Sequence, residues 1–237
     1  MSKIKSLESL YKDIFGSKFI GFDLTSAVSQ AVHSKSTKED KCVLCKHQNV
    51  SCPSFKNRQD LPFFKNIEQV DTMVIAEAPG KGIEEGVLGS VFGLHNFLSP
   101  KAISLKDKYY YNYFNRILGL DMDRTYITDC LKCYTDKSDL NKSFKFCSAF
   151  LKKEIELLNP QKILWITKQV DVSEFINKNN LHEISTIIPH PSNQNLSKIP
   201  TVAEIFDSIG EIQQSEHLKR IAKEIKDVYN EWRAKLR

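Results

Sequence analysis

The stretch Thr72–Phe92 reads TMVIAEAPGKGIEEGVLGSVF, a short apolar run followed by a loop rich in glycine and glutamate. The run Thr72–Ala76 is apolar and β-branched, which predicts a buried strand. The loop after it contains Pro79, four glycines and three glutamates. Glycines that follow a strand are typical of a phosphate-binding loop. The lysine and serine or threonine pair of a P-loop is missing, however, and the glutamates would repel phosphate, so we expect a different ligand.

Length and composition favour one soluble α/β domain. The 237 residues are 41% hydrophobic, which is enough for a full core, and we interpret residues 1–237 as a single domain. No apolar run approaches the roughly 20 residues that span a bilayer, so we expect a cytoplasmic protein without membrane contact. The net charge of +5 is compatible with a polyanionic partner, although a mildly basic surface is more often only solvated.

Three further runs resemble Thr72–Ala76 in length and hydrophobicity: Thr125–Leu131, Lys162–Thr167 and Ser185–Pro189. Nearly continuous hydrophobicity over such short lengths is typical of strands that are buried on both faces of a parallel sheet. The fold predicted from these runs is a three-layer αβα sandwich around a central four-stranded parallel sheet.

Helical patterns lie between the predicted strands, at Tyr109–Leu118, Phe144–Leu158 and Gln169–Lys178. The alternation of strand and helix indicates βαβ units. In such sheets the ligand site lies beyond the carboxyl ends of the strands, which selects the loops after Ala76, Asp129 and Pro189.

The two ends of the chain have different patterns. Residues 1–40 are predicted to form an N-terminal helix and a polar linker. Residues 202–237 carry apolar side chains at helical spacing and predict a long amphipathic C-terminal helix. We expect it to pack on the sheet, while a partner-binding helix is the alternative.

Six cysteines point to metal or redox chemistry. Cys42 and Cys45 form a C-x-x-C pair, and in a cytosolic chain such a pair favours metal or redox chemistry over a structural disulfide. Cys130 and Cys133 form a second pair. If Thr125–Lys132 is a strand, these two side chains point to opposite faces, and Cys130 is the better candidate for a buried apolar role.

Cys133 can then join Cys42 and Cys45 in one site. The fourth thiolate is either Cys147, on the next predicted helix, or Cys52. Four cysteines that include only one close pair suit an iron–sulfur cluster that holds distant segments together, with zinc as the alternative.

Five segments occur in an order that resembles a known family. They are AEAPG at residues 76–80, GSVFG at 89–93, YITDCLKC at 126–133, FCSAFLKKEIELLNPQKILWI at 146–166 and HPS at 190–192. This set is similar to the uracil-DNA glycosylase superfamily, especially its iron–sulfur family 4 and family 5 branches. The resemblance runs from Cys42 to about Asn195.

The resemblance implies roles for particular residues. The implied ligands of a 4Fe-4S cluster are Cys42, Cys45, Cys133 and Cys147. The implied first motif comprises Glu77, Ala78, Pro79 and Gly80, and the second comprises His190, Pro191 and Ser192, followed by Asn195. Phe92 matches the aromatic residue that stacks on the base.

The implied activity is monofunctional removal of uracil, or of another deaminated base, from DNA in base excision repair. The implied partner is DNA that contains such a base, and we expect a monomer associated with the nucleoid. The alternative is a member of the superfamily with weakened catalysis that acts as a DNA-binding or protein-binding module.

The chemistry of base excision requires residues of these types. The target nucleotide must be flipped into a pocket, and cleavage of the N-glycosidic bond leaves an oxocarbenium-like sugar and an anionic base. His190 can donate to uracil O2. Ala78 stands where the best-known branch has the aspartate that orients water, so activation must come from Glu77, from Glu84 or Glu85, or from the backbone.

Several residues near the expected site have two interpretations. Leu196 is either a wedge that fills the space of the flipped base or an ordinary leucine that anchors a loop. Lys81, Lys132 and Lys198 either contact phosphates or lie near the site by chance, because the chain has many lysines.

Asp129 stands where the family generally has the asparagine that reads uracil. An amide matches both the N3–H donor and the O4 acceptor of uracil, whereas an ionised carboxylate only accepts. A protonated carboxyl group can do both, and burial in a base pocket favours that form. We therefore expect weaker or more pH-sensitive activity on uracil and a broader range of bases, including cytosine and hypoxanthine.

Overall fold

The computed structural model describes residues 2–15, 19–23, 30–33, 59–80, 88–92, 113–167 and 169–188. The helices are α1 (Lys3–Phe15), α3 (Leu140–Leu158) and α4 (Ser173–Lys178). The strands are β1 (Phe19–Asp23), β2 (Gln30–His33), β3 (Gln59–Leu61), β4 (Thr72–Ala76), β5 (Leu88–Ser90), β6 (Thr125–Asp129), β7 (Lys162–Ile166) and β8 (Ser185–Ile187). Single helical turns occur at Ile67–Gln69, Tyr113–Ile117, Lys137–Asp139 and His182–Ile184. None of the described helices is long and apolar enough to cross a membrane.

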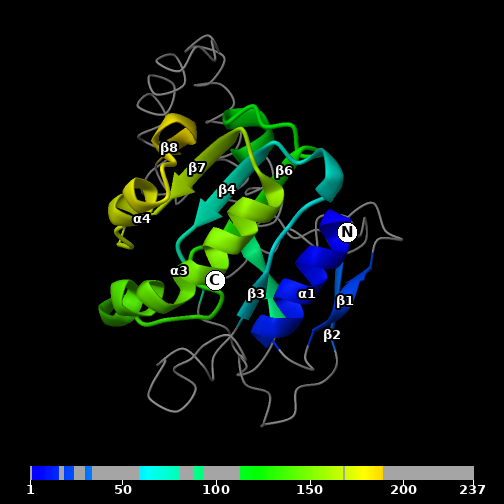
Figure 1. The fold of residues 1–237 in the computed structure, drawn as a ribbon, viewed down its shortest axis with the longest axis horizontal. Coiled ribbons are helices and arrows are strands. Elements are labelled where there is room, and N and C mark those ends of the chain that lie inside the picture. Colours follow the sequence, from blue (N-terminus) through cyan, green and yellow to red (C-terminus); the bar gives the residue numbers. More distant parts are fainter. Residues whose placement is uncertain are drawn as a thin grey trace, which may run out of the picture.

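A four-stranded parallel sheet with the order β6-β4-β7-β8 forms the centre of the molecule (Figure 1). Because β6 and β7 lie on opposite sides of β4, the connection that contains α3 must pass over β4. Ala76 at the end of β4 is in register with Asp129 of β6 and with Ile166 of β7. The predicted four-stranded parallel sheet is confirmed, and three of its carboxyl ends are level.

Both faces of the sheet are buried. Met73 and Ile75 of β4 belong to the main hydrophobic core, whereas Val74, which points to the opposite face, is also fully buried. Ile127 and Leu164 repeat this pattern on the neighbouring strands. The fold is therefore an α/β sandwich, as the continuous hydrophobicity of the strands predicts.

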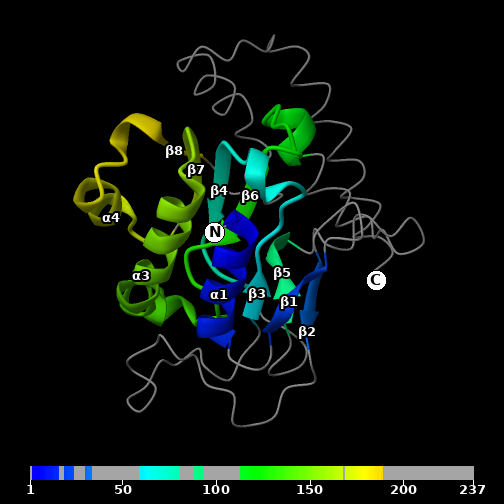
Figure 2. The same cartoon turned by 45° about the vertical axis from the view of Figure 1, so that its right-hand side comes forward.

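Helices α1 and α3 pack together on one face of the sheet (Figure 2). Helix α1 buries Leu7, Tyr11 and Ile14, which lie on one side of a helix because they are spaced by four and three residues. Helix α3 ends where Asn159 adopts the left-handed conformation (φ 48°) and donates its N–H to the Ile155 carbonyl at 2.8 Å.

Helix α1 lies within the first 40 residues, where a helix was predicted, and it is followed by a small sheet that was not predicted. Strands β1 and β2 form this sheet as an antiparallel pair. A second small sheet, the parallel pair β3 and β5, was also not predicted. Strands of three to five residues give a weak periodicity signal, which explains both omissions. The predicted helix over residues 202–237 lies outside the described residues.

Several elements are shorter than predicted. Strand β6 ends at Asp129 rather than Leu131, because the next residues turn away from the strand direction. Strand β7 ends at Ile166 rather than Thr167, and β8 at Ile187 rather than Pro189. Helix α4 begins at Ser173 rather than Gln169, because the chain bends at residues 169 and 170.

Candidate active site at the carboxyl end of the sheet

The first predicted motif and Asp129 lie side by side at the carboxyl edge of the sheet. Asp129 is the last residue of β6, is only 3% exposed and pairs in register with Ala76. Glu77 follows Ala76 directly, so the motif leaves β4 next to the end of β6. This arrangement agrees with the rule that ligand sites of parallel sheets lie beyond the strand ends.

Backbone hydrogen bonds hold the turn after β6 against the first motif. The N–H of Cys130 donates to the Ala76 carbonyl at 2.8 Å, and that of Leu131 donates to the Glu77 carbonyl at 3.2 Å. On the other side, the N–H of Asp60 donates to the Lys132 carbonyl at 3.3 Å. Residues 129–132 therefore have a defined position between β4 and β3.

Glu77 joins two loops of the site. Its Oε1 accepts hydrogen bonds from the backbone N–H groups of Gln169 and Val170, the latter at 2.8 Å. These residues follow β7, so the carboxylate ties the loop after β4 to the loop after β7. Sequence reasoning identified Glu77 only as a candidate for water activation and did not detect this structural contact.

The remaining residues of the first motif differ in exposure. Ala78 is partly buried against the core, Pro79 is buried and Gly80 is exposed. A Cβ atom placed on Gly80 would have no atom of the described residues within 4 Å. The described part of the chain thus leaves room for a ligand to approach the Gly80 backbone.

Phe92, the predicted stacking residue, has a strained backbone. Its φ of 54° lies in the left-handed region that non-glycine residues rarely adopt. The ring is partly buried, and its centroid lies 5.2 Å from that of Phe114. Strain at a single aromatic residue is frequent at ligand sites, where the surrounding structure holds the side chain in place.

The three described cysteines occupy different environments. Cys130 is fully buried in the hydrophobic core, as predicted, although it follows β6 rather than lying within it. Its burial, together with the negative charge of Asp129, raises the pKa of the Cys130 thiol. A thiol that stays protonated fits an apolar role better than a metal ligand.

Cys133 and Cys147 lie on the connection from β6 and on α3 respectively. Cys133 is 9% exposed, and Cys147 is partly buried against the core. Within the described ranges, no group of three or more His, Cys, Asp or Glu side chains is arranged to hold a metal ion. Cys42 and Cys45, the other two predicted ligands, lie outside those ranges.

The phosphate-contact interpretation of Lys132 is wrong. This side chain is 2% exposed and forms an ion pair with Glu154 of α3, with 2.5 Å between Nζ and Oε2. A buried ammonium group with an anionic partner cannot reach a DNA phosphate. One feature of the sequence indicates a buried partner for a cation: Glu154 interrupts the apolar side of α3 between Leu151 and Ile155.

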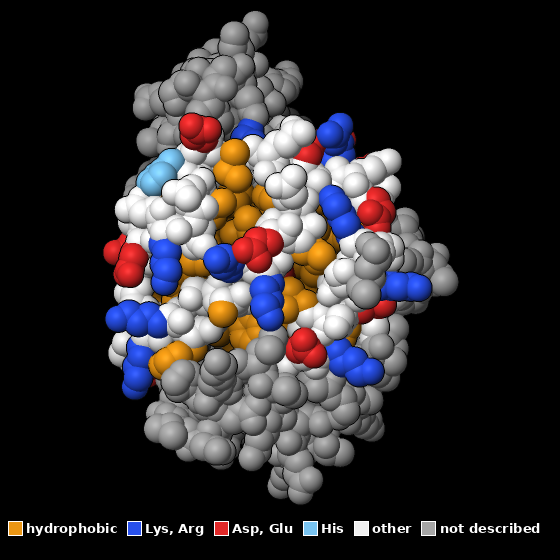
Figure 3. Space-filling view, viewed as in Figure 1, with side chains coloured by type: hydrophobic (Ala, Val, Ile, Leu, Met, Phe, Trp, Pro, Cys, Tyr) orange, Lys and Arg blue, Asp and Glu red, His pale blue; other side chains and the backbone are white. Residues whose placement is uncertain are grey.

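Basic side chains do not gather over α1 and α3. On the face shown in Figure 3, lysine and arginine side chains are interspersed with acidic ones. The described part of this face therefore lacks the single-sign patch that attracts a polyanion. Other predicted site residues lie outside the described residues: Lys81, Glu84, Glu85, His190, Ser192, Asn195, Leu196 and Lys198.

Comparison with known proteins identifies the family. No curated protein matched the chain. The model of the uracil DNA glycosylase superfamily matches residues 62–209, a span that contains the first motif, Asp129 and the second motif. The chain belongs to the uracil DNA glycosylase superfamily, a family of hydrolases that act on DNA in its repair.

Proposed function

We propose that this protein is a monofunctional DNA glycosylase that excises uracil, or another deaminated base, by hydrolysing the N-glycosidic bond. The observation that supports the proposal is the register of Asp129 with Ala76, because a buried carboxyl group thereby lies beside the first motif, where we propose that it reads the base. The substrate is DNA that contains the deaminated base, and we propose that a monomer acts on it in base excision repair.

The proposed pocket receives a flipped nucleotide. Extrusion costs a few kcal/mol of stacking and pairing, and stacking on an aromatic ring offsets part of this cost. Phe92 supplies the ring, and the carboxyl group of Asp129 faces the Watson–Crick edge of the base. Gly80 permits the sugar and backbone of the DNA to approach the first motif, with Ala78 and Pro79 lining the same loop. Ser192 and Asn195 complete the pocket from the second motif, and Leu196 is the proposed wedge.

Bond cleavage needs stabilisation of the departing base. His190 donates a hydrogen bond to the O2 position of the pyrimidine, where negative charge develops. Glu77 is the carboxylate proposed to orient water, because Ala78 has no polar side chain. Its negative charge also suits the cationic sugar of the transition state.

Cys42, Cys45, Cys133 and Cys147 are the proposed ligands of a 4Fe-4S cluster, with zinc as the alternative. A bound cluster supplies a structural link between segments that are distant in the sequence. The described members of the set support this role in part: Cys133 precedes α3 and is buried, and Cys147 lies on α3 and packs against the core.

The deciding experiment is release of free base from a uracil-containing oligonucleotide. We expect turnover by the wild type and a loss of roughly 100-fold to 1,000-fold in His190→Ala, the usual effect of removing one donor to a developing anion. A matched cytosine, hypoxanthine and thymine series measures the range of bases. Absence of base release, with retained binding of DNA, would instead support a binding module.

A further inference from the structure

A fully buried ion pair connects the turn after β6 to helix α3. Lys132 Nζ and Glu154 Oε2 are 2.5 Å apart, and the two side chains are 2% and 0% exposed. Neither residue belongs to the first or the second motif, and Lys132 lies three positions after Asp129 in the chain.

The ammonium group of Lys132 donates to three acceptors, two of which belong to the end of β6. Besides Glu154, Nζ donates to Thr128 Oγ1 at 2.5 Å and to the backbone carbonyl of Asp129 at 2.9 Å. An ammonium group has three donors and no acceptor, so these contacts satisfy it completely. The side chain thereby folds back over the last two residues of β6.

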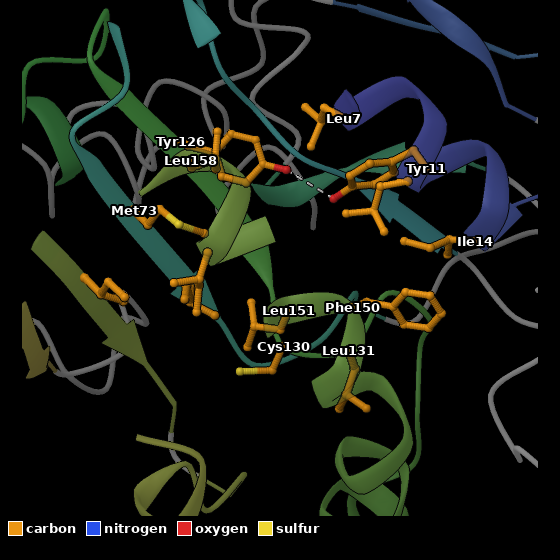
Figure 4. Close-up of a cluster of buried hydrophobic side chains, with 14 of the residues drawn as sticks. Leu7, Tyr11, Ile14, Met73, Tyr126, Cys130, Leu131, Phe150, Leu151 and Leu158 are labelled. Atoms are coloured by element: carbon orange, nitrogen blue, oxygen red, sulfur yellow. Dashed lines mark hydrogen bonds between the residues drawn. The ribbon is translucent and has the colours of Figure 1, made fainter. Parts of the chain in front are cut away.

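The carboxylate of Glu154 is also fixed by hydrogen bonds, from two tyrosine hydroxyls. Its Oε1 accepts from Tyr11 at 2.5 Å and from Tyr126 at 2.6 Å. The two tyrosine hydroxyls face one another at 3.3 Å (Figure 4). Burial, with the charge of Glu154 as a further cause, raises the pKa of both tyrosines, so they remain protonated donors. The network connects α1, β6, α3 and the turn.

Stability alone does not explain such a pair. Removing two charges from water is expensive, and apolar residues of similar volume are often as good or better for stability. A buried pair does impose a specific geometry, because any other arrangement leaves a charge unsatisfied. What this pair specifies is the conformation of the residues that Lys132 contacts.

We propose that Lys132 and Glu154 form a positioning pair that sets the conformation of the Asp129–Cys133 turn. The ammonium group holds the Asp129 carbonyl, while the N–H groups of Cys130 and Leu131 bind the first motif. The pair therefore fixes the conformation of the end of β6. This conformation determines the orientation of Asp129 toward the base. This role in base selection rests on the proposed glycosylase function.

Two variants test the pair as a unit. Lys132→Met/Glu154→Gln removes both charges at similar volume, and the amide oxygen of the glutamine still accepts from the two tyrosines. Glu154→Gln alone leaves the ammonium group buried without its anionic partner and opposite an amide N–H₂ group. Amide hydrogen exchange at Cys130 and Leu131 is measured in the wild type and in both variants, with the amides of β7 as an internal reference.

We expect exchange at Cys130 and Leu131 to become at least tenfold faster in the double variant than in the wild type, and faster than in the wild type in Glu154→Gln, with β7 unchanged. The ratio of kcat/KM for uracil over other bases should change in the double variant. Wild-type protection of the turn in the double variant would overturn the proposal, as would an unaltered base ratio in an active enzyme whose turn has loosened. If the wild type releases no base but the turn loosens, the positioning of the turn stands and the glycosylase function fails.

If the double variant does not fold, Thr128→Val provides a second test. It removes one of the two uncharged acceptors that hold the ammonium group over the Asp129 carbonyl and suits a β-strand. We expect faster exchange at Cys130 and Leu131 than in the wild type, and unchanged exchange there would overturn the proposal.

Discussion

The carboxylate of Glu77 accepts a hydrogen bond from the backbone N–H of Val170, a residue 93 positions further along the chain. The neighbouring N–H of Gln169 donates to the same oxygen. The residue proposed to orient water therefore also holds the loops after β4 and β7 together. Suitable substitutions can separate these two roles.

Glu77→Gln and Glu77→Ala should differ in stability. The amide oxygen of glutamine can accept both N–H groups, so we expect a nearly unchanged melting temperature for Glu77→Gln. Glu77→Ala leaves both donors without this acceptor and should lower the free energy of unfolding by about 2 kcal/mol. Thermal unfolding of both variants measures this difference.

Catalysis provides the second measurement on the same variants. If Glu77 orients water, kcat for base release should fall by about 100-fold in Glu77→Gln, the lower end of general-base effects, although the fold is intact. A Gln variant with the wild-type rate would assign Glu77 to the loop contact alone and transfer water activation to Glu84, Glu85 or the backbone.

Gly80→Ala tests the approach of DNA to the first motif. A methyl group at this position meets no atom within 4 Å among the residues that the structure describes, so we expect the unfolding free energy to stay within about 0.5 kcal/mol. If DNA approaches the backbone there, kcat/KM should fall at least about tenfold, equivalent to roughly 1.4 kcal/mol. A melting curve together with single-turnover kinetics separates the two effects, and an unchanged kcat/KM would place the DNA elsewhere.

The sequence predicted the sheet well because its signal is local. Residues Ile163–Ile166, for example, are all apolar, and a strand buried on both faces can be recognised from its own residues, without knowledge of the strands beside it. The order of the strands was not predicted, because it depends on the path of α3 over β4.

The candidate site was predicted only where side chains follow strand ends. Asp129 was placed correctly at the end of β6. For Lys132 a phosphate contact was one of two interpretations, and it is wrong. A lysine in a sequence gives no indication of burial, and its partner Glu154 is 22 residues away. The contact between Glu77 and Val170 was likewise inaccessible, since it depends on the positions of two loops in space.

Asp129→Asn should sharpen the preference for uracil. A buried amide can donate to O4 and accept from N3–H at any pH, whereas a carboxyl group must be protonated to do both. We expect a higher ratio of kcat/KM for uracil over cytosine and hypoxanthine, and a flatter acidic side of the pH profile. A wild type that is strictly uracil-specific, with no change in the variant, would show that Asp129 does not read the base.

The cysteines should separate into ligands and core residues. Protein purified without oxygen should be brown and contain about four iron and four sulfide per chain. Cys147→Ala should abolish the colour, whereas Cys130→Ala, its matched control in the core, should keep it. Stoichiometric zinc without iron would replace the cluster assignment, and loss of colour in Cys130→Ala alone would exchange the roles of the two residues.

Helix α1 is synthesised before α3, and its buried side is covered completely only when both are present. Strand β1 follows α1 directly and covers part of that side, whereas Tyr11 contacts Glu154 across 143 residues. An amphipathic helix in a growing chain exposes apolar surface that binds chaperones or promotes aggregation. We expect nascent chains to acquire protease resistance only after α3 has emerged from the ribosome.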